Sequence, residues 1–476
     1  MLFPAVLDDL IPADHVCRVL DAFVAGLAMA GLELGCTASS RNRPQGPPEV
    51  IWKMRRFRLP RVFKRSIFRS LVSFERQNPN RQEVVLRTIG RTFLASNQVP
   101  AQKLKSPSLT SLFSKESEHG PGNMTQTHIN RIATSVPSYE VHAAFIGYAE
   151  RMLQDPRVRN IFLRVAGLAG ISNRFSGLQM GHAIEQDGLS AYDFYQLGRF
   201  PATGRRMELY ERFAPPLMRA TTDKLRLTAA ERTRIKHVIV TSCTGFYAPG
   251  LDFDIIDHLG LSSSVERTMV GFMGCYAALN ALKLARHIVR SQPADSVLIV
   301  NLELCTLHLQ ETQDLAEVLS FLIFGDGCAA SLISADEVGL AMDEFASIQI
   351  PNTRDLITWN VRDLGFDMLL SGRVPAAIGR TLREKRELFL ADGPVELWAV
   401  HPGGRSILDA VEVSLCLRPN QLQASRNVLD HYGNMSSATV MFVLEEQMQS
   451  VRGGEKGYAM SFGPGLIAEI MRFHAI

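Results

Sequence analysis

The stretch Val270-Gly-Phe-Met-Gly-Cys-Tyr-Ala-Ala-Leu-Asn-Ala-Leu-Lys-Leu-Ala-Arg-His-Ile-Val-Arg290 joins an apolar run, two glycines, one cysteine and a helical pattern. The glycines allow a tight backbone turn, and the apolar residues that follow recur with the spacing of one helix face. Cys275 is therefore predicted at the start of a helix over Gly274–Val289. Unpaired N–H groups and the positive end of the helix dipole favour a nucleophilic thiolate there. The alternative is a small buried hydrophobic residue, as most free cysteines are.

Short apolar runs before and after this helix predict buried strands. They are His237–Thr241, Ser296–Asn301 and Leu397–Val400, and their β-branched content is typical of central strands. Helical patterns lie between them, as in Arg405–Leu417. Alternating strands and helices predict an α/β fold with largely parallel sheets. A strand, a loop and a helix follow one another in both halves, which suggests two related halves facing one cleft.

Composition limits the classes of protein. The chain has 476 residues, enough for two or three domains or one large duplicated α/β unit. A hydrophobic content of 46% and a charged content of 21% are ordinary for a water-soluble globular protein. A net charge of +3 implies no general affinity for nucleic acid. Seven scattered cysteines without a C-x-x-C pair favour a reducing cytosol.

We expect neither a membrane span nor a secretory signal. The most apolar window, Val16–Gly35, contains Arg18, Asp21 and Glu33, whereas a span needs about 18 apolar residues in a row. Acidic residues near the N-terminus stand where a signal would be basic. The sequence predicts a cytoplasmic protein.

The first 123 residues differ in character from the rest. Ten Lys or Arg stand against one acid between Arg41 and Arg69, with aromatic residues among them. Such a run either grips phosphates or anionic lipid, or forms a solvated tail, and we expect a poorly ordered or partly helical basic extension. Residues 103–123 read as a linker. Leu10–Val24 resembles the opening of transposase N-terminal regions, so one hypothesis is that translation begins at Met124.

Three polar residues stand after strand-like runs or glycine turns, where a side chain can face a cleft. They are Cys275, His401 in Trp-Ala-Val-His-Pro-Gly-Gly, and Asn434 in Tyr-Gly-Asn-Met-Ser-Ser. A histidine beside the cysteine would hold it as a thiolate–imidazolium pair, and an asparagine amide would donate to a thioester carbonyl as it becomes an oxyanion or enolate. Each residue alone is more often structural, and linear order says nothing about proximity.

Five motifs occur in order between about Met124 and the C-terminus. They are GFMGCYAALNALKLA at Cys275, IFGDG at 323–327, WAVHPGGRSILDAVE from Trp398, YGNMSSATVMFVLEE from Tyr432 and SFGPGLIAEI from Ser461. Together they resemble the type III polyketide synthases of the chalcone synthase family, in the thiolase superfamily. Ketoacyl synthases usually continue their histidine as His-Gln-Ala-Asn, whereas this chain has His-Pro-Gly-Gly.

The resemblance implies a thiolase-like layered αβαβα fold with two pseudo-repeated halves. We assign 1–123 to the extension, 124–340 to the half that carries the cysteine and 341–476 to the half that carries histidine and asparagine. It also implies a homodimer that uses acyl-CoA and malonyl-CoA without metal or organic cofactor. Cys275 would accept the starter acyl group, His401 would sustain the thiolate, and Asn434 would assist His401 in decarboxylating malonyl-CoA. A cyclised pyrone or phenolic product would follow.

The same resemblance implies a set of pocket residues. Phe324 matches the gatekeeper phenylalanine at the active-site mouth, and Phe366 matches its partner. The other implied pocket positions line the elongation and cyclisation cavity, the last of them from the neighbouring subunit: Cys243, Cys305, His308, Ser436 and Ala248. Plant relatives usually have threonine at the first three and methionine at the last. Starter, number of extensions and ring closure are therefore not predicted.

Coenzyme A binding is the least complete part of the resemblance. Three basic residues are expected near the phosphates, but only Arg164 matches, because Ile161 and Leu168 stand at the other two positions. The implied coenzyme A contacts are Arg164, Gly403, Gly404 and Ser406. Compensating basic residues would be Arg159, Arg174 or Arg405.

Two other functions remain open from the sequence. One is a ketoacyl synthase that performs a single condensation and depends on an acyl carrier protein. The other is an inactive condensing fold led by a DNA-binding or membrane-binding basic arm; for 124–476 no nucleic-acid partner is expected.

Overall fold

The computed structural model describes residues 125–179, 190–390, 394–418 and 420–476. The predicted N-terminal extension, with its basic aromatic run and linker, lies outside the described residues. The boundary between 340 and 341 stays a prediction.

A nine-stranded sheet in two parts forms the framework. The first part has the order β1 (His128–Ser135), β7 (Asp326–Ser334), β6 (Ser296–Leu304), β4 (Ile235–Ser242) and β5 (Glu266–Gly271), and the second has the order β11 (Leu397–Val400), β12 (Lys456–Gly463), β13 (Ile467–Ala475) and β8 (Leu340–Gln349). β1 and β8 join the parts through only two residue pairs, His128 with Ala341 and Ile129 with Leu340. Each part can therefore pack as a separate layer.

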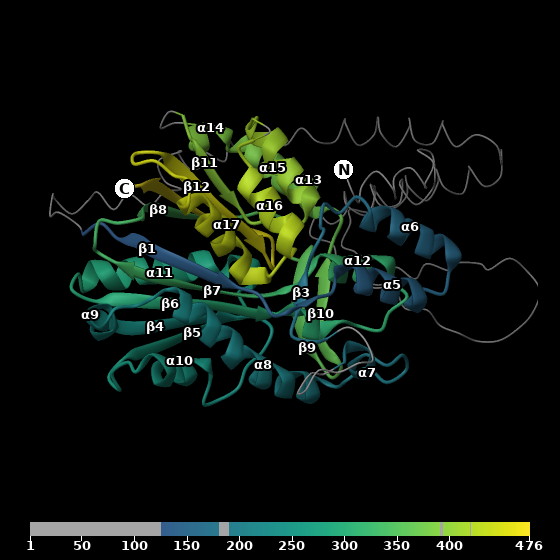
Figure 1. Cartoon of the computed structure of the whole chain (residues 1–476). Coiled ribbons are helices and arrows are strands. Elements are labelled where there is room, and N and C mark those ends of the chain that lie inside the picture. Colours follow the sequence, from purple (N-terminus) through teal and green to yellow (C-terminus); the bar gives the residue numbers. More distant parts are fainter. Residues whose placement is uncertain (1–124, 180–189, 391–393, 419) are drawn as a thin grey trace, which may run out of the picture. The chain divides into compact units, whose positions relative to one another are not determined.

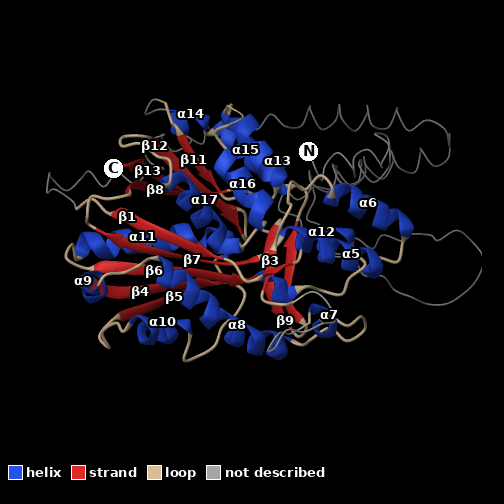
Figure 2. Ribbon diagram, viewed as in Figure 1, coloured by secondary structure: helices blue, strands red, loops and turns tan. Residues whose placement is uncertain are grey.

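Helices lie between the two sheet parts and on their outer sides (Figures 1 and 2). α11 (Ala277–Ser291) and α17 (Thr439–Met448) share one buried cluster with strands of both parts, which places them between the layers. α8 (Thr203–Lys224) and α10 (Leu251–Leu259) pack on the first part, and α13 (Val374–Glu384) and α15 (Arg405–Leu415) pack on the second. The predicted layered α/β fold is confirmed.

Shorter elements complete the described chain. They are the helices α5 (His142–Met152), α6 (Pro156–Ala166), α7 (Ala191–Phe194), α9 (Ala229–Arg234), α12 (Leu315–Ile323), α14 (Arg386–Leu390) and α16 (Gln423–Tyr432), the 3-10 turns η2 (Gly274–Tyr276), η3 (Cys305–His308) and η4 (Ser436–Ala438), and the strand pairs β2 (Tyr139–Glu140) with β3 (Phe175–Ser176) and β9 (Ile357–Arg362) with β10 (Gly365–Leu370).

The prediction of largely parallel sheets is wrong. β4 runs parallel to β5 and β6, and β11 runs parallel to β12, but β1, β7, β8 and β13 pair antiparallel to their neighbours. The strands predicted from sequence, β4, β6 and β11, are all members of parallel pairs. Strands such as β7 (DGCAASLIS) have few β-branched residues although every residue is buried. Burial in the sheet outweighs their weak strand propensity.

Two predicted helices are present with shifted ends. The helix predicted over Gly274–Val289 begins as η2 and continues as α11 to Ser291. The helix predicted over Arg405–Leu417 ends earlier, because Cys416 adopts a left-handed conformation with φ 54° and the N–H of Leu417 donates to the carbonyl of Glu412. This is a common way to end a helix.

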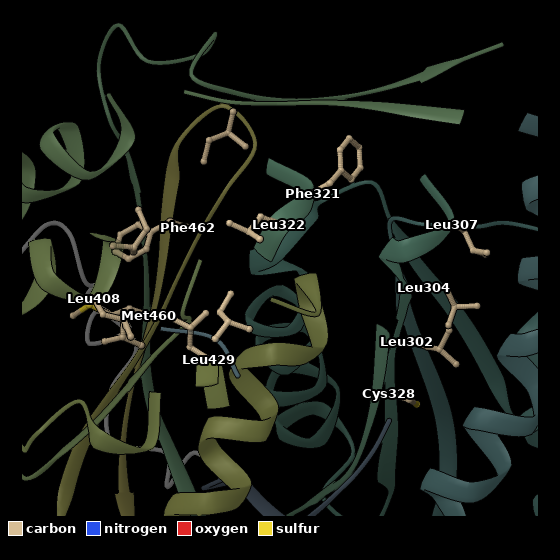
Figure 3. Close-up of a cluster of buried hydrophobic side chains, with 14 of the residues drawn as sticks. Leu302, Leu304, Leu307, Phe321, Leu322, Cys328, Leu408, Leu429, Met460 and Phe462 are labelled. Atoms are coloured by element: carbon tan, nitrogen blue, oxygen red, sulfur yellow. The ribbon is translucent and has the colours of Figure 1, made fainter. Parts of the chain in front are cut away.

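Buried side chains from distant parts of the chain form one core (Figure 3). Leu302 and Leu304 come from β6, Phe321 and Leu322 from α12, and further members from the C-terminal part of the chain: Leu408, Leu429, Met460 and Phe462. The core therefore reaches from β6, which follows the cysteine helix, to β12, which follows His401 in the sequence. It fixes the loops between them, which carry the polar residues of the site.

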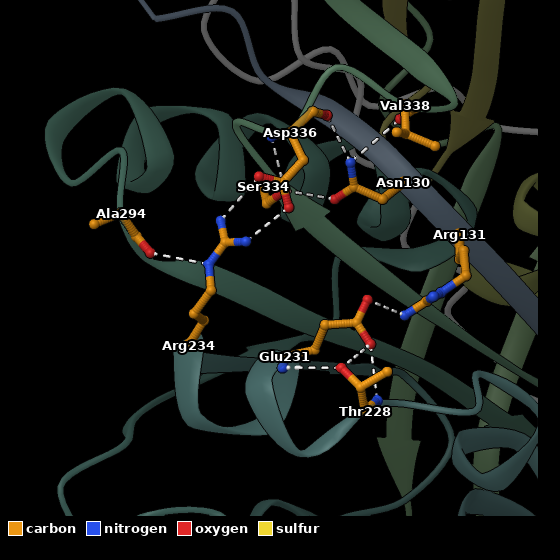
Figure 4. Close-up of polar contacts among 9 residues, drawn as sticks. All are labelled: Asn130, Arg131, Thr228, Glu231, Arg234, Ala294, Ser334, Asp336 and Val338. Carbon is orange, nitrogen blue, oxygen red and sulfur yellow. Dashed lines mark hydrogen bonds and ion pairs between the residues drawn. The ribbon is translucent and has the colours of Figure 1, made fainter.

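Polar contacts fasten α9 and the end of β7 to the sheet (Figure 4). Arg131 on β1 pairs with Glu231 at 2.5 Å, and Arg234 pairs with Asp336 at 2.8 Å. Thr228 caps α9 through a reciprocal bond with Glu231. These partly exposed ion pairs add little stability individually.

Candidate active site

Cys275 lies in the turn between β5 and α11. Gly274 has φ +74°, and a Cβ there would stand 2.2 Å from Cδ of Pro464. Its N–H donates to Sγ of Cys243 at 2.9 Å. Only glycine fits this turn without displacing Pro464, so the glycine before the cysteine fixes where the thiol points.

A cavity of about 30 Å³ surrounds the thiol, and we call it the nucleophile cavity. Its walls come from the loop after β4, η2, η3, the end of α12, the β9–β10 hairpin, η4 and the loop after β12. The residues are Cys243, Thr244, Gly274, Cys275, Cys305, Phe321, Phe324, Ile357, Trp359, Met368, Ser436 and Pro464. Three of the predicted pocket residues with small polar side chains, Cys243, Cys305 and Ser436, are among them. The cavity is mostly apolar, with sulfur and hydroxyl groups near the nucleophile.

Ser436 and Asn434 approach Cys275 from the turn before α17. Oγ of Ser436 lies 3.8 Å from Sγ of Cys275. Oδ1 of Asn434 accepts from the backbone N–H of Ser436 at 2.8 Å, so the oxygen end of the amide is held by its own loop. The Asn434 side chain acts to lower the pKa of the Cys275 thiol, and with its oxygen held by the loop its NH₂ end is the one left for the nucleophile. The structure thus brings two of the three predicted catalytic residues together.

His401 is buried at the end of β11. Its backbone N–H donates to the carbonyl of Met460 at 2.7 Å. β12 continues to Gly463, where a Cβ would stand 3.2 Å from the backbone nitrogen of Cys275. Neither ring nitrogen of His401 has a hydrogen-bond partner among the described residues, and the ring does not line the nucleophile cavity. Its catalytic role stays a prediction.

Burial shifts the pKa values of the Cys275 thiol and the His401 imidazole. It raises the pKa of the Cys275 thiol to about 12, although hydrogen bonds from Ser436 and Asn434 act in the opposite direction. Burial also lowers the pKa of His401 to about 3. Burial therefore favours the uncharged thiol and the uncharged imidazole. Desolvation acts against the thiolate that the helix start favours.

Sequence reasoning missed Glu303, a fully buried carboxylate behind the nucleophile. It accepts from the N–H of Cys243 at 2.9 Å, from Oγ1 of Thr244 at 2.7 Å and from Oγ of Ser437 at 2.6 Å. It therefore joins the loop after β4 to the turn that carries Ser436. The signal in the sequence was a single acid inside β6, all of whose residues are buried.

Replacing Glu303 by glutamine is expected to change how stability depends on pH. Burial raises the pKa of Glu303 from 4.5 to about 7. Between these values the folded chain keeps a proton that the unfolded chain has released, so the free energy of unfolding falls as pH rises. The fall amounts to ~3 kcal/mol, and Glu303→Gln should remove it. Denaturant unfolding at about pH 5 and about pH 8 measures this difference; Glu208→Gln, on the surface, is the control, and an equal fall in Glu303→Gln would contradict the prediction.

His308 and Phe366 are not among the residues that line the nucleophile cavity. His308 is fully buried; Nδ1 accepts from the N–H of Phe366 at 3.1 Å, and Nε2 therefore donates to the carbonyl of Thr244 at 2.7 Å. The two rings stack with centroids 4.1 Å apart. Neither residue lines the nucleophile cavity, whereas Phe324 does. The structure does not bring the predicted aromatic pair to one cavity.

The predicted coenzyme A residues lie on two neighbouring elements. Arg164 is exposed in the last turn of α6, and Gly403, Gly404 and Ser406 form the start of α15. The guanidinium of Arg405 donates to the carbonyl of Leu168 at 3.3 Å, which joins these elements.

The compensating arginines proposed from sequence differ in their surroundings. Arg174 is buried and donates to His142 and to the carbonyls of Phe321 and Phe324. Arg159 donates to the carbonyl of Leu153. Arg405 is exposed at the start of α15. Among these three arginines, Arg405 is the one that the structure places beside the predicted coenzyme A residues.

The layered fold, with a cysteine in the turn that opens a central helix, defines a condensing enzyme of the thiolase type. Sequence models of chalcone and stilbene synthases match this chain, the N-terminal domain at residues 205–337 and the C-terminal domain at 339–476. The α-pyrone synthesis polyketide synthase-like protein Pks18 of Mycobacterium tuberculosis is 36% identical over 299 residues, which cover 58% of this chain and 75% of the relative. The chain belongs to the chalcone and stilbene synthase family and is a type III polyketide synthase, an acyltransferase.

Solved structures agree with this membership. PKS-I from the brown alga Ectocarpus siliculosus superposes with a TM-score of 0.69 at 29% identity, covering 75% of this chain and 100% of that one. The 1,3,6,8-tetrahydroxynaphthalene synthase of Streptomyces coelicolor, a bacterial type III polyketide synthase, gives 0.66 at 28% identity and covers 73% and 99%. The prediction of a thiolase-like fold is confirmed. No helix in the described part of the chain is long and apolar enough to cross a membrane.

Proposed function

We propose that this chain condenses an acyl-CoA starter with successive malonyl-CoA units on Cys275 and releases a cyclised pyrone or phenolic product. The observation that supports this most directly is a half-buried thiol within 3.8 Å of the Ser436 hydroxyl, close to the Asn434 side chain, in a mostly apolar cavity. A neutral His401 would take the thiol proton as the thiol attacks the starter thioester, and coenzyme A would leave with that proton.

Chain extension uses the same groups. Malonyl-CoA loses carbon dioxide, and its carbonyl oxygen gains negative charge that the Asn434 amide and His401 would stabilise. The resulting carbanion attacks the Cys275 thioester, forms a carbon–carbon bond and frees the thiolate. The β-ketoacyl-CoA then reloads on Cys275. Loss of carbon dioxide drives each step, so this scheme requires no metal or organic cofactor.

Coenzyme A would enter between α6 and the start of α15. Gly404 has φ +142° and opens α15, and the N-terminus of this helix favours negative charge. Arg164 and Arg405 would contact the phosphates from the two sides. This arrangement supports a free coenzyme A thioester as substrate, and we expect the enzyme to act in the cytoplasm.

The active unit would be a homodimer. β5 is an edge strand, and Met269 on it is 44% exposed. Phe246 and Met273, near the Cys275 turn, are each 37% exposed, and Ala248 is exposed as well. Exposed apolar side chains beside an unpaired strand edge favour association. Sedimentation of the purified chain at the mass of one subunit would contradict this.

Phe324→Ser is expected to change which starters are accepted and how many extensions occur. Phe324 is 6% exposed and stands in the cavity wall directly after α12. Removing its ring opens volume without removing a polar group of the site. Product analysis with short, long and aromatic acyl-CoA starters measures the change. Phe389→Ser, which removes a buried ring elsewhere, is the control; an unaltered product spectrum in Phe324→Ser would make its ring a packing residue only.

Incubation of the purified chain with malonyl-CoA and a panel of acyl-CoAs tests the proposal as a whole. Cyclised products of several condensations support it. A single condensation that depends on an acyl carrier protein would favour a ketoacyl synthase instead.

A further inference from the structure

The end of α12 is completed by groups from outside the helix. In a regular helix the N–H of Gly325 would donate to the carbonyl of Phe321, four residues earlier. It donates instead to the carbonyl of Asn434 at 3.0 Å, and the N–H of Asn434 donates to the carbonyl of Ile323 at 2.8 Å. The asparagine proposed to act in decarboxylation is therefore attached to this helix end by two backbone hydrogen bonds.

Arg174 takes the place of the missing helical donor. Its Nη1 donates to the carbonyl of Phe321 at 3.0 Å and to that of Phe324 at 2.5 Å, and the residue is 2% exposed. The last carbonyls of a helix need donors, and a positive charge suits the negative end of the helix dipole. Burial lowers the pKa of Arg174 to about 9, while Glu140 and Asp326 act in the opposite direction. The guanidinium is therefore charged at neutral pH.

The stem of Arg174 also packs against the residue before Asn434. Gly433 has φ +68°, and a Cβ there would stand 2.8 Å from Cγ of Arg174 and 2.6 Å from the carbonyl oxygen of Ile323. Only glycine fits between the arginine stem and the helix end. The arginine therefore touches the Asn434 turn directly, as well as the helix on which that turn rests.

The chain before Arg174 is tied to α16, which leads into the same turn. The N–H groups of Ser172 and Asn173 donate to the carbonyl of Asp430 at 2.8 and 3.0 Å. Oγ of Ser172 donates to the Asp430 carboxylate at 2.5 Å. The segments that carry Arg174 and Asn434 are therefore fastened together close to both residues.

His142 orients the guanidinium. Nε of Arg174 donates to Nδ1 of His142 at 2.9 Å, so this ring nitrogen is an acceptor and the proton of the neutral imidazole is on Nε2. Burial lowers the pKa of His142 to about 4, and the charge of Arg174 acts in the same direction. The imidazole is therefore neutral at neutral pH and keeps Nδ1 as an acceptor, which leaves Nη1 of the arginine for the carbonyls of α12.

We propose that Arg174 is a positioning residue for decarboxylation: its guanidinium caps α12, so that Gly325 stays paired with Asn434 and the Asn434 amide is held at the nucleophile cavity. This inference rests on the proposed function. Without the guanidinium, the buried carbonyl of Phe321 has no donor, and the N–H of Gly325 is the one that helix geometry offers it. Asn434 then loses one of its two backbone bonds to α12, and its amide moves from the place where it donates.

A double-mutant cycle of Arg174→Met and Asn434→Ala tests the proposal. The measurement is carbon dioxide release from malonyl-CoA in the Cys275→Ala chain, which reports decarboxylation alone. With Asn434 in place, Arg174→Met should slow release at least about tenfold, because a small misplacement of an acting group costs that much. In the Asn434→Ala background the same substitution should cost less than about threefold, since the group it positions is gone. Equal losses in the two backgrounds would overturn the proposal.

Arg206→Met is the matched control. Arg206 is fully buried and donates to the carbonyls of Leu307 and Leu309 at 2.7 and 2.9 Å. Neither carbonyl belongs to α12 or to the turn that carries Asn434. Any loss in Arg206→Met should therefore be the same with and without Asn434. A coupling to Asn434 as large as that of Arg174→Met would overturn the specific role of Arg174.

Acyl loading distinguishes positioning from collapse of the site. In a chain that keeps Cys275, Arg174→Met should take an acetyl group from acetyl-CoA within about threefold of the unaltered rate, because loading is assigned to Cys275 and His401. Intact mass measures this. Absence of carbon dioxide release in the unaltered chain would contradict the proposed function itself, whereas normal release in Arg174→Met would overturn only the role of Arg174.

Two variants of His142 decide the case in which Arg174→Met does not load. Both keep the arginine. His142→Asn returns an acceptor near the place of Nδ1, whereas His142→Leu does not. Release of carbon dioxide should be at least about threefold slower in His142→Leu than in His142→Asn, because the guanidinium loses the hydrogen bond that orients it. Equal rates in the two variants would overturn the proposal.

Discussion

Cys275→Ala is expected to abolish polyketide formation, with a loss of at least about 10⁴-fold in turnover, because it removes the thiol proposed to carry the acyl group. The thiol lies in the nucleophile cavity with Ser436 at 3.8 Å. Alanine leaves these surroundings in place and removes only sulfur. The measurement is product formation from malonyl-CoA and a starter, together with the intact mass of the protein after exposure to the starter alone. The unaltered chain should gain one acyl group and the variant none.

Cys328→Ala is the matched control for this variant. Cys328 is also a buried cysteine, but it lies within β7 and does not line the nucleophile cavity. It should retain acyl loading and product formation. Cys275→Ala should also still release carbon dioxide from malonyl-CoA, because the groups proposed for that step are Asn434 and His401. That residual activity shows that the variant is folded. Undiminished condensation in Cys275→Ala would remove the covalent mechanism.

The strands and the helix predicted from the sequence are those whose burial and intrinsic propensity favour the same secondary structure. β4, β6 and β11 are short, apolar and β-branched, and each lies in the sheet where the pattern placed it. α11 shows its helical spacing because one side packs between the two sheet parts while Lys283 stays partly exposed. The antiparallel strand β7 was missed because its sequence, DGCAASLIS, has few β-branched residues.

The candidate site was predicted through motifs and not through spacing. Cys275 and Asn434 are 159 positions apart, and their contact depends on how β5 and the turn before α17 are packed. Nothing in their neighbouring residues fixes that distance. His308 illustrates the opposite failure. Its position suggested a pocket residue, but Phe366 stacks on its ring and both its nitrogens bind backbone groups.

Buried charges were the hardest feature to predict. Arg174 was a candidate for coenzyme A phosphates because it is basic and follows Arg164 in sequence. The structure buries it against α12, where it holds the carbonyls of Phe321 and Phe324. Glu303 is a similar case inside β6. A sequence pattern reports the average environment of a segment. It does not show whether a single polar residue within that segment is buried or exposed.

Asn434 supplies the second large effect, which concerns decarboxylation rather than acyl loading. Its Oδ1 is engaged by the N–H of Ser436 at 2.8 Å and by Oγ1 of Thr439 at 3.4 Å. Only the NH₂ end is left to donate to a thioester oxygen. Asn434→Asp keeps the oxygen that holds the turn and removes the donor, whereas Asn434→Ala removes both. The two variants therefore separate catalysis from loop structure.

Both variants should slow decarboxylation of malonyl-CoA by about 10²–10³-fold, the usual cost of one oxyanion donor. Asn434→Asp adds a negative charge near the developing enolate, so its loss should be at least as large as that of Asn434→Ala. Thermal unfolding should show the reverse order, with Asn434→Ala the less stable. His401→Gln should slow decarboxylation as well, since it removes the other proposed donor. Carbon dioxide release from malonyl-CoA in the Cys275→Ala background measures this step alone. A normal rate in Asn434→Asp would show that the amide serves only to hold the turn, and the stabilisation of the enolate would then have to come from other groups of the cavity.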